Sequence, residues 1–171
     1  MIESNKQRMS DTFVAIDFET ADRFRDSACA VGMVRVESGK IVHKEQRLIK
    51  PPRKYFEFTY IHGITWDMVA LEPDFQKSWS SLKDILNGVD FLAAHNASFD
   101  SSVLHACCAK SNIKPPTIPF RCTVSLARET WGLYPTKLPD VCRHLNIPLN
   151  HHEALSDAVA CAEIVIAASK E

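Results

Sequence analysis

The chain has 171 residues, of which 46% are hydrophobic and 24% are charged. This composition is typical of one folded domain with a sizeable core, and it excludes disordered and fibrous chains. The net charge is −1, from 20 basic and 21 acidic residues. The chain therefore lacks the strong basic excess that is typical of proteins that bind long duplex nucleic acid.

The N-terminal residues, the apolar runs and the cysteines predict in which compartment the protein is found. The first eleven residues are polar and lack the apolar stretch of a secretory signal. The longest apolar runs, such as Ile164–Ala168, are too short to span a bilayer. The six cysteines show no CxxC pair and no zinc-ligand spacing, so we interpret them as reduced core residues. We expect a polar tail at residues 1–11, one domain over residues 12–171, a cytoplasmic protein and no membrane contact.

The first half of the domain contains the longest strand patterns. Apolar and β-branched runs predict strands at Thr12–Phe18, Ala28–Val36 and Lys40–Ile49, and the third is ended by Pro51 and Pro52. The aromatic-rich segment at residues 53–65 is predicted to be a loop. Its rings are suited to stacking on bases, but packing over the sheet is the interpretation that we prefer.

Helices and short strands alternate in the rest of the chain. Short strands are predicted at Asp90–Ala94 and Phe120–Cys122. Three strands followed by this alternation predict an α/β fold with a mixed five-stranded sheet flanked by helices. The predicted helices are Trp66–Leu71, Ser78–Asn87, Ser98–Lys110, Val124–Trp131, Leu138–Leu145 and Glu153–Ser169.

Two carboxylates fall on one face of the first predicted strand. The segment reads FVAIDFET, and the alternation of a strand puts Asp17 and Glu19 on the face of Ala15, opposite Val14, Ile16 and Phe18. Like charges this close repel each other, and their burial without a partner is costly. A divalent cation relieves both problems. For a D-x-E segment alone, a strand end hydrated by solvent is the simpler interpretation.

Two further acids begin predicted helices and face inward. Asp100 heads a stripe with Val103, Leu104 and Cys107, and Asp157 shares a stripe with Cys161, Ile164 and Ala168. Each acid alone is explained by the favourable charge of a helix N-terminus. Together with Asp17 and Glu19 they form a set of four, and four carboxylates are enough to hold two divalent ions for chemistry at phosphorus.

A histidine lies just before the last of these helices. His152 precedes Asp157 by five residues, and its simplest role is that of a capping or surface histidine. Beside a metal site, a histidine near its ordinary pKa is suited to deprotonate an attacking water at neutral pH. The adjacent His151 is interpreted as structural or solvent-facing.

These residues resemble the motifs of a known family, the DEDDh 3′–5′ exonucleases, in particular the proofreading subunit of bacterial replicative polymerases and its stand-alone relatives. The matching segments are DFET, HNASFD, the final His-x4-Asp and IHGIT at Ile61–Thr65, and the similarity runs from Thr12 to Ser169. The resemblance implies a ribonuclease H-like fold. The subtype with a catalytic tyrosine is disfavoured, because Glu153 stands four residues before Asp157.

The resemblance also implies roles for individual residues. It implies two Mg²⁺ or Mn²⁺ ions, His152 as general base, and release of nucleoside 5′-monophosphates from nucleic-acid 3′ ends. Substrate contacts are implied for Phe18, Thr20, Glu57, His62 and Asn96. The metal ligands implied are Asp17, Glu19, Asp100 and Asp157.

The sequence departs from the family pattern in one place and leaves alternatives open. Many relatives continue the first motif with TTGL, whose leucine wedges between bases, whereas this chain reads TADRFRD, so Phe24 is the candidate replacement. We expect a free-standing monomer or homodimer, with a polymerase partner undecided. DNA, single-stranded or frayed, is the expected substrate, and an exoribonuclease or oligonucleotide hydrolase is the alternative. A non-catalytic nucleic-acid-binding module is the alternative from another class, although all five motif positions are filled.

Overall fold

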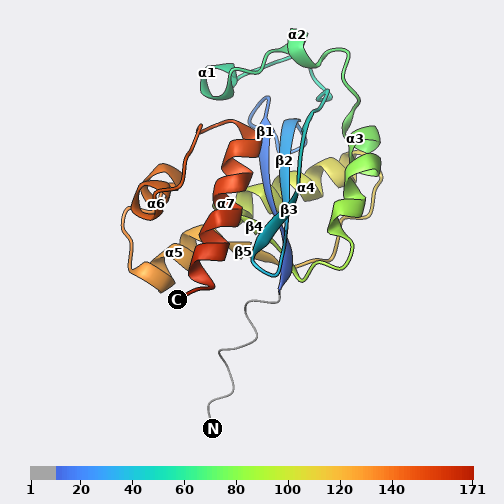
Figure 1. Cartoon of the computed structure of the whole chain (residues 1–171). Helices are drawn as coiled ribbons and strands as arrows, with labels where there is room; N and C mark the ends of the chain where they lie inside the picture. Colours follow the sequence, from blue (N-terminus) through green and yellow to red (C-terminus); the bar gives the residue numbers. More distant parts are fainter. Residues whose placement is uncertain (1–10) are drawn as a thin grey trace.

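The computed structural model describes residues 11–171, so the predicted polar tail lies outside the described residues except for Asp11. The described chain forms one sheet with helices on both faces (Figure 1). The strands are β1 (Thr12–Thr20), β2 (Ala28–Glu37), β3 (Lys40–Leu48), β4 (Phe91–Ala94) and β5 (Phe120–Cys122). The helices are α1 (Thr59–His62), α2 (Trp66–Val69), α3 (Phe75–Leu82), the 3-10 helix η1 (Lys83–Leu86), α4 (Ala97–Lys110), α5 (Thr123–Trp131), α6 (Leu138–Leu145) and α7 (Ala154–Ala168).

The sheet is mixed and has the order β3-β2-β1-β4-β5. β1 and β3 run antiparallel to β2, whereas β1, β4 and β5 run parallel to one another. This confirms the predicted five-stranded mixed sheet flanked by helices. β1 lies at the centre, so side chains near its end are surrounded by chain segments from both halves of the domain.

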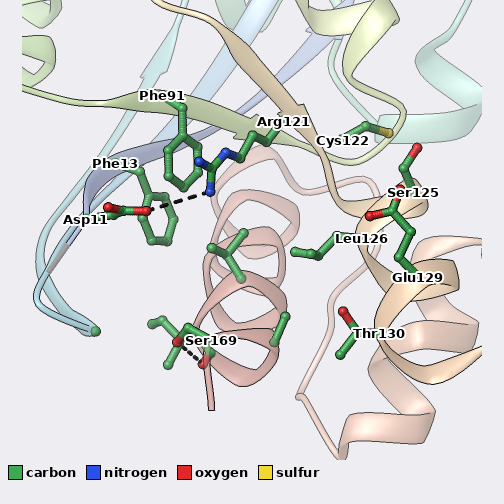
Figure 2. Close-up of a pocket in the computed structure, with 14 residues that line it drawn as sticks. Asp11, Phe13, Phe91, Arg121, Cys122, Ser125, Leu126, Glu129, Thr130 and Ser169 are labelled. Atoms are coloured by element: carbon green, nitrogen blue, oxygen red, sulfur yellow. Dashed lines mark hydrogen bonds and ion pairs between the residues drawn. The ribbon is translucent and has the colours of Figure 1, made fainter. Parts of the chain in front are cut away.

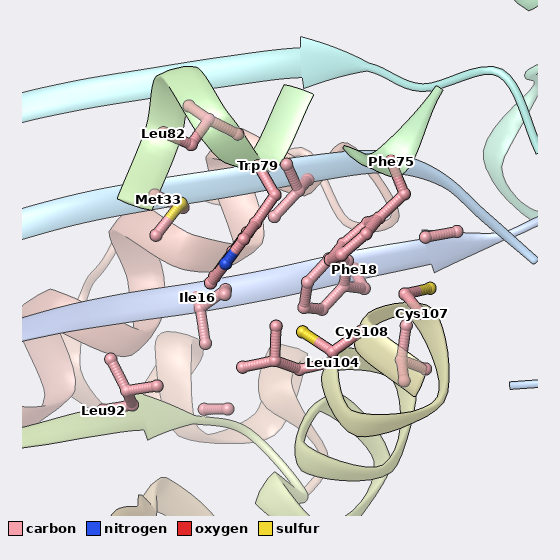
Figure 3. Close-up of a cluster of buried hydrophobic side chains, with 14 of the residues drawn as sticks. Ile16, Phe18, Met33, Phe75, Trp79, Leu82, Leu92, Leu104, Cys107 and Cys108 are labelled. Carbon is pink, nitrogen blue, oxygen red and sulfur yellow. The ribbon is translucent and has the colours of Figure 1, made fainter. Parts of the chain in front are cut away.

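Alternation along β1 divides the core into two layers. Val14, Ile16 and Phe18 pack against α3, η1 and α4, and Figure 3 shows Ile16 and Phe18 beside Trp79 of α3 and the α4 side chains. The opposite face of β1 packs against α5, α6 and α7. Because Asp17 and Glu19 share that opposite face, the strand directs both carboxylates toward α7.

The structure corrects several predicted boundaries, most of them by one residue, and the predicted helix Trp66–Leu71 ends at Val69, where the chain continues as a turn. β1 continues to Thr20, two residues further than predicted, because its antiparallel pairing with β2 continues to that point. The predicted helix Ser78–Asn87 begins at Phe75, where the Asp74 side chain accepts a hydrogen bond from the Lys77 N–H, and its last turn is the 3-10 helix η1. The segment at residues 53–65, predicted as loop, contains the single turn α1.

The segment carrying α1 and α2 crosses the end of the sheet where β1 finishes and α7 begins (Figure 1). Ile64 and Val69 are buried there against Cys29 and Ala154, with Phe56 and Trp66 packed beside them. Part of this aromatic segment therefore packs over the sheet, as preferred from the sequence.

Composition predicted reduced cysteines and no membrane span. All six cysteines belong to the described part of the chain and are free, and five of them are buried. Among residues 11–171, no helix combines the length and the apolar character needed to cross a membrane.

A cavity of about 350 Å³ lies at the start of β1, at the opposite end of that strand from Asp17 and Glu19. Figure 2 shows Phe13 and Phe91 stacked in its wall, with the Arg121 guanidinium between Phe91 and the Asp11 carboxylate. The Arg121 cation stacks on the Phe91 ring and lies 3.7 Å from Asp11, so its charge has partners within the wall.

Candidate active site

Four carboxylates converge where β1 ends and α4 and α7 begin. Oxygens of Asp17, Glu19 and Asp157 lie within 4.8 Å of one another. Asp100 approaches from the first turn of α4, where its Oδ1 accepts a hydrogen bond of 2.9 Å from the Phe18 N–H. The fold therefore brings together all four acids that strand and helix periodicity place on inward faces.

A glycine allows α7 to approach the sheet closely enough for this arrangement. Gly32 on β2 pairs with Asp17 across the ladder. A Cβ at Gly32 would lie 2.3 Å from the Ala154 carbonyl oxygen and 2.7 Å from the Leu155 Cα, both backbone atoms at the start of α7. Only glycine fits this contact. The contact determines how closely the start of α7, and with it Asp157, approaches Asp17 on β1.

Replacing Gly32 with alanine is expected to move the start of α7 and separate Asp157 from Asp17. Overpacking of this kind costs roughly 1–3 kcal/mol, and each kcal/mol lowers Tm by roughly 2–4 °C in a domain of this size. The Gly32→Ala protein should also lose most of the Tm increase that Mg²⁺ produces. Thermal unfolding with EDTA and with Mg²⁺ measures both effects.

Gly39→Ala is the matched control for that experiment. Gly39 has φ +73°, so alanine is strained there, but a Cβ meets no atom within 4 Å. This variant should be less stable than the wild type and should keep the full Mg²⁺ response. Equal Mg²⁺ responses in Gly32→Ala and in the wild type would contradict the role given to Gly32.

Burial and mutual repulsion raise the pKa values of the four acids above their ordinary range. Burial, followed by repulsion from Asp157 and Asp100, raises the pKa of Glu19 to about 8. Burial also raises the pKa of Asp100 to about 7, although the Phe18 N–H opposes this shift. The pKa values of Asp17 and Asp157 are raised too, with burial the largest cause for each. Because ionisation of the four acids is unfavourable in the empty cluster, a bound cation would be strongly favoured there.

The donors present fit a hard divalent metal ion. Asp17 Oδ2 and Asp157 Oδ1 are buried, and neither has a hydrogen-bond partner among the described residues. Buried polar atoms without partners are rare in folded proteins and call for an explanation such as an ion. In the group formed by Asp17, Glu19 and Asp157, every ligand atom is a carboxylate oxygen, the ligand type that Mg²⁺ and Mn²⁺ prefer.

His152 lies at the mouth of this cluster, in the turn before α7. Its backbone has φ 69°, in the left-handed region, and its N–H donates a hydrogen bond of 3.1 Å to Asp157 Oδ2. The ring is exposed and stacks on the His151 ring at 3.7 Å between centroids. Partial burial, followed by the neighbouring His151, lowers the pKa of His152. The neutral ring needed to accept a proton is therefore favoured.

His151 is exposed, as expected, and it also contacts the cluster directly. Its Nδ1–H donates a hydrogen bond of 2.9 Å to the same Asp157 Oδ2 atom. Both histidines therefore orient one carboxylate, His151 through its ring and His152 through its backbone.

Three of the predicted substrate-binding residues lie at the end of β1 or are bonded to it. Phe18 is 2% exposed, its side chain lies in the core and its N–H is donated to Asp100, so it presents almost no surface to a ligand. Thr20 is buried, and its carbonyl accepts a 2.9 Å hydrogen bond from His62 Nε2–H. His62 Nδ1 in turn accepts from the Ile64 N–H, which fixes the neutral tautomer of His62.

Glu57 and Asn96 lie on different sides of the site. The Glu57 N–H donates to the Ala21 carbonyl, and its side chain is half-buried. Asn96 is exposed at the start of α4 and lines a cleft of about 500 Å³ that also contains Asp17 and Asp157. Contact with a nucleotide remains a prediction for all five of these substrate residues.

The loop after β1 is braced by an arginine. The Arg53 guanidinium donates hydrogen bonds to both Asp22 and Asp26, at 2.9 Å and 2.5 Å for the shortest contact to each. The same guanidinium lies over the Phe24 ring, 5.1 Å from its centroid, and Phe24 is 57% exposed. The candidate wedge is thus held on a rigid loop beside the end of β1, and its role as a wedge stays a prediction.

Two residues of the site were not identified from the sequence. An isolated glycine within a strand pattern is a signal for close backbone approach, and Gly32 carries that signal. His95 is fixed by hydrogen bonds to Thr123 and Thr136, 28 and 41 residues further along the chain. No local pattern in the sequence indicates those contacts.

Comparison with known proteins identifies similar sequences. The RNase T family model, described as an exonuclease, matches residues 14–165. Over 174 residues the chain is 32% identical to the PolC-type DNA polymerase III of Clostridium perfringens, a match that covers 96% of this chain and 12% of that protein. Over 169 residues it is 32% identical to exodeoxyribonuclease 10 of Escherichia coli, which covers 88% of this chain and 66% of that protein. The chain therefore spans about one eighth of its PolC-type relatives.

Solved structures show the same fold. Exonuclease X in complex with 5′ overhanging duplex DNA is 26% identical, with a TM-score of 0.76 over 92% of this chain and 91% of that one. The nuclease domain of 3′hExo, a DEDDh family member bound to rAMP, is 19% identical, with a TM-score of 0.81 over 96% and 93% of the two chains. The ribonuclease H-like architecture expected from the sequence is thereby confirmed.

Proposed function

The chain belongs to the exonuclease family, and from that membership we propose that it hydrolyses the terminal phosphodiester bond at the 3′ end of a DNA strand and releases nucleoside 5′-monophosphates. One observation carries this proposal. Asp17, Glu19 and Asp157 place carboxylate oxygens within 4.8 Å of one another, and two buried oxygens of the cluster have no hydrogen-bond partner among the described residues.

Asp17, Glu19, Asp100 and Asp157 would hold two Mg²⁺ or Mn²⁺ ions. Bound there, the ions supply stabilisation of the negative charge that develops at the phosphate. The protein contributes the position of the ligands. The Phe18 N–H orients Asp100, and the His151 ring and the His152 N–H orient Asp157. Hydrogen bonds of this kind hold ligand carboxylates in one orientation before a substrate arrives.

His152 would act as the general base. Its neutral ring takes a proton from the attacking water, and the exposed turn before α7 leaves the ring free to approach a bound strand end. A single water-activating residue at the mouth of the site suits the removal of one nucleotide at a time from an end.

DNA is the proposed substrate because a similar sequence is named for DNA and a similar structure was solved with it. Exodeoxyribonuclease 10 is named for DNA, and exonuclease X was solved with duplex DNA. RNA is the second candidate, because the fold is shared with a 3′-exonuclease solved in recognition of a histone mRNA stem-loop. The non-catalytic binding module is disfavoured, since such a module has no use for a complete set of converging acids.

Digestion of three end-labelled substrates by the purified chain tests this proposal. Single-stranded DNA, duplex DNA and RNA of one sequence are incubated with Mg²⁺, and we expect mononucleotides from the first time point on DNA. Circular single-stranded DNA should stay intact because it offers no 3′ end. Internal cuts in the circle would contradict the exonuclease, and faster loss of the RNA would replace DNA by RNA as the substrate.

A further inference from the structure

One wall of the catalytic cleft carries positive charge and an aromatic ring. Arg128 of α5, Tyr134 of the connection between α5 and α6, and Lys137 at the start of α6 line the same cleft of about 500 Å³ as Asp17 and Asp157. We call these three residues the cleft rim. Neither the motifs nor the proposed hydrolysis assigns them a role.

The rim is anchored to the strand-to-helix junction that carries Asn96. The Thr136 carbonyl accepts a 2.9 Å hydrogen bond from His95 Nε2–H, and the Thr136 hydroxyl accepts a 3.0 Å hydrogen bond from Arg128 Nε. Thr136 is only 5% exposed, and His95 Nδ1 is bonded to the Thr123 hydroxyl. The rim therefore keeps a fixed position relative to the acids of the cleft.

The charges and the ring of the rim have few partners in the protein. Within residues 11–171, neither Arg128 nor Lys137 forms an ion pair with a carboxylate. By contrast, Arg53 near the other side of the site is engaged by both Asp22 and Asp26. The Tyr134 side chain is 88% exposed. Two unpaired cations and an open ring on one wall match a ligand with phosphates and flat bases.

We propose that the cleft rim binds the part of the nucleic-acid strand directly 5′ of the terminal nucleotide. Lys137 and Arg128 contact phosphates of that segment, and Tyr134 stacks on one of its bases. The chain has a net charge of −1 and an acidic cleft floor, so a strand needs local positive charge to enter. This inference rests on the proposed exonuclease function, because it assumes a strand end among the acids.

A pair of substrates separates the rim from the catalytic centre. The p-nitrophenyl ester of thymidine 5′-monophosphate has a scissile phosphate but no upstream strand, whereas a fluorescein-labelled thymidine 12-mer has both. Lys137→Gln and Tyr134→Ala are compared with the wild type on each. On the 12-mer we expect kcat/KM to fall about eightfold in Lys137→Gln at 50 mM salt and roughly 5- to 140-fold in Tyr134→Ala. Because the ester lacks the contacts of the rim, its hydrolysis should stay within about twofold of the wild type.

Binding provides a readout that does not depend on hydrolysis. Fluorescence anisotropy of the 12-mer, measured with Ca²⁺ in place of Mg²⁺, gives affinity against salt concentration. Removing one phosphate contact should lower the slope of log K against log salt by about 0.7, so the deficit of Lys137→Gln shrinks to about threefold at 200 mM salt. Lys40→Gln, at the start of the edge strand β3, is the matched control and should keep the wild-type slope. Tyr134→Phe retains the ring and should restore the affinity lost in Tyr134→Ala.

Each outcome bears on one of the two proposals. If both variants bind and hydrolyse the 12-mer as the wild type does, the proposed role of the cleft rim is wrong. An equal loss of kcat/KM on the ester and on the 12-mer would also contradict it. If the wild-type protein hydrolyses neither substrate with Mg²⁺, the proposed exonuclease function is wrong. In that protein, a reduced salt slope for Lys137→Gln would still support the rim as a strand-binding surface.

Discussion

Replacing Asp17 with asparagine should abolish hydrolysis and, at the same time, stabilise the metal-free protein. Asp17 is central to the acid cluster, and one of its oxygens is buried without a hydrogen-bond partner among the described residues. Loss of a ligand to the ions removes stabilisation worth several kcal/mol at the phosphate, so activity should fall roughly 10³-fold or more. Without metal, the same change removes a buried acid whose ionisation is opposed by burial and by repulsion from four neighbouring acids.

The pH dependence of stability follows from the direction of the pKa shifts. Free Asp and Glu ionise near pH 4, whereas the folded protein raises the pKa of Asp100 to about 7 and that of Glu19 to about 8. Such groups stabilise the fold fully below pH 4, and this contribution is lost as pH rises through 7 and 8. The metal-free wild type should therefore unfold at a lower temperature at pH 8 than at pH 6. The advantage of Asp17→Asn should be larger at pH 8.

Thermal unfolding in EDTA and in Mg²⁺ at the two pH values measures this. Mg²⁺ should raise the Tm of the wild type, since an ion that binds only the folded state stabilises it, and it should raise that of Asp17→Asn little. Asp84→Asn, at an exposed acid of η1, removes the same charge away from the cluster and should behave as the wild type does. Full activity in EDTA, or an unchanged Mg²⁺ response in Asp17→Asn, would rule out the metal site.

The acid cluster could be predicted from the sequence because local periodicity encodes it. Alternation along a strand placed Asp17 and Glu19 on one face, and helical stripes turned Asp100 and Asp157 inward; the structure confirms each of these directions. A strand or a helix fixes the direction of a side chain within a few residues, so a pattern read over eight to fifteen residues was sufficient.

Other parts of the site depend on contacts that no local pattern contains. The role of Gly32 depends on the backbone of Ala154, more than 100 residues further along the chain. The cleft rim is positioned by the hydrogen bond between His95 and Thr136. The single turn α1 forms over a small cluster that joins Ile64 to Cys29 and Ala154, and isolated turns of this length are not stable without such packing.

Replacing His152 with alanine should lower turnover by roughly 10²–10⁴, the usual contribution of a positioned base. The acids that would hold the metal remain, and Asp157 keeps its hydrogen bond from residue 152 because the backbone N–H is the donor. Metal binding, measured as the Mg²⁺-dependent increase in Tm, should therefore be preserved, and so should affinity for an oligonucleotide. Loss of turnover with both kinds of binding intact distinguishes a base from a ligand.

The pH profile provides the second test of His152. A base acts in its neutral form, so wild-type turnover should rise with pH through the pKa of His152. Because burial and His151 lower that pKa, the midpoint should lie below the ordinary histidine value of about 6.5. In His152→Ala this part of the rise should disappear.

His151→Ala is the comparison that fixes the assignment between the two histidines. The His151 ring bonds Asp157 Oδ2, so its loss should weaken the Mg²⁺ response moderately. Turnover at saturating Mg²⁺ should stay within about tenfold of the wild type, because the second hydrogen bond to Asp157 remains and the base is intact. A greater loss of turnover in His151→Ala than in His152→Ala would transfer the role of base to His151. If both variants turned over at the wild-type rate, the proton of the attacking water would have to go to another group.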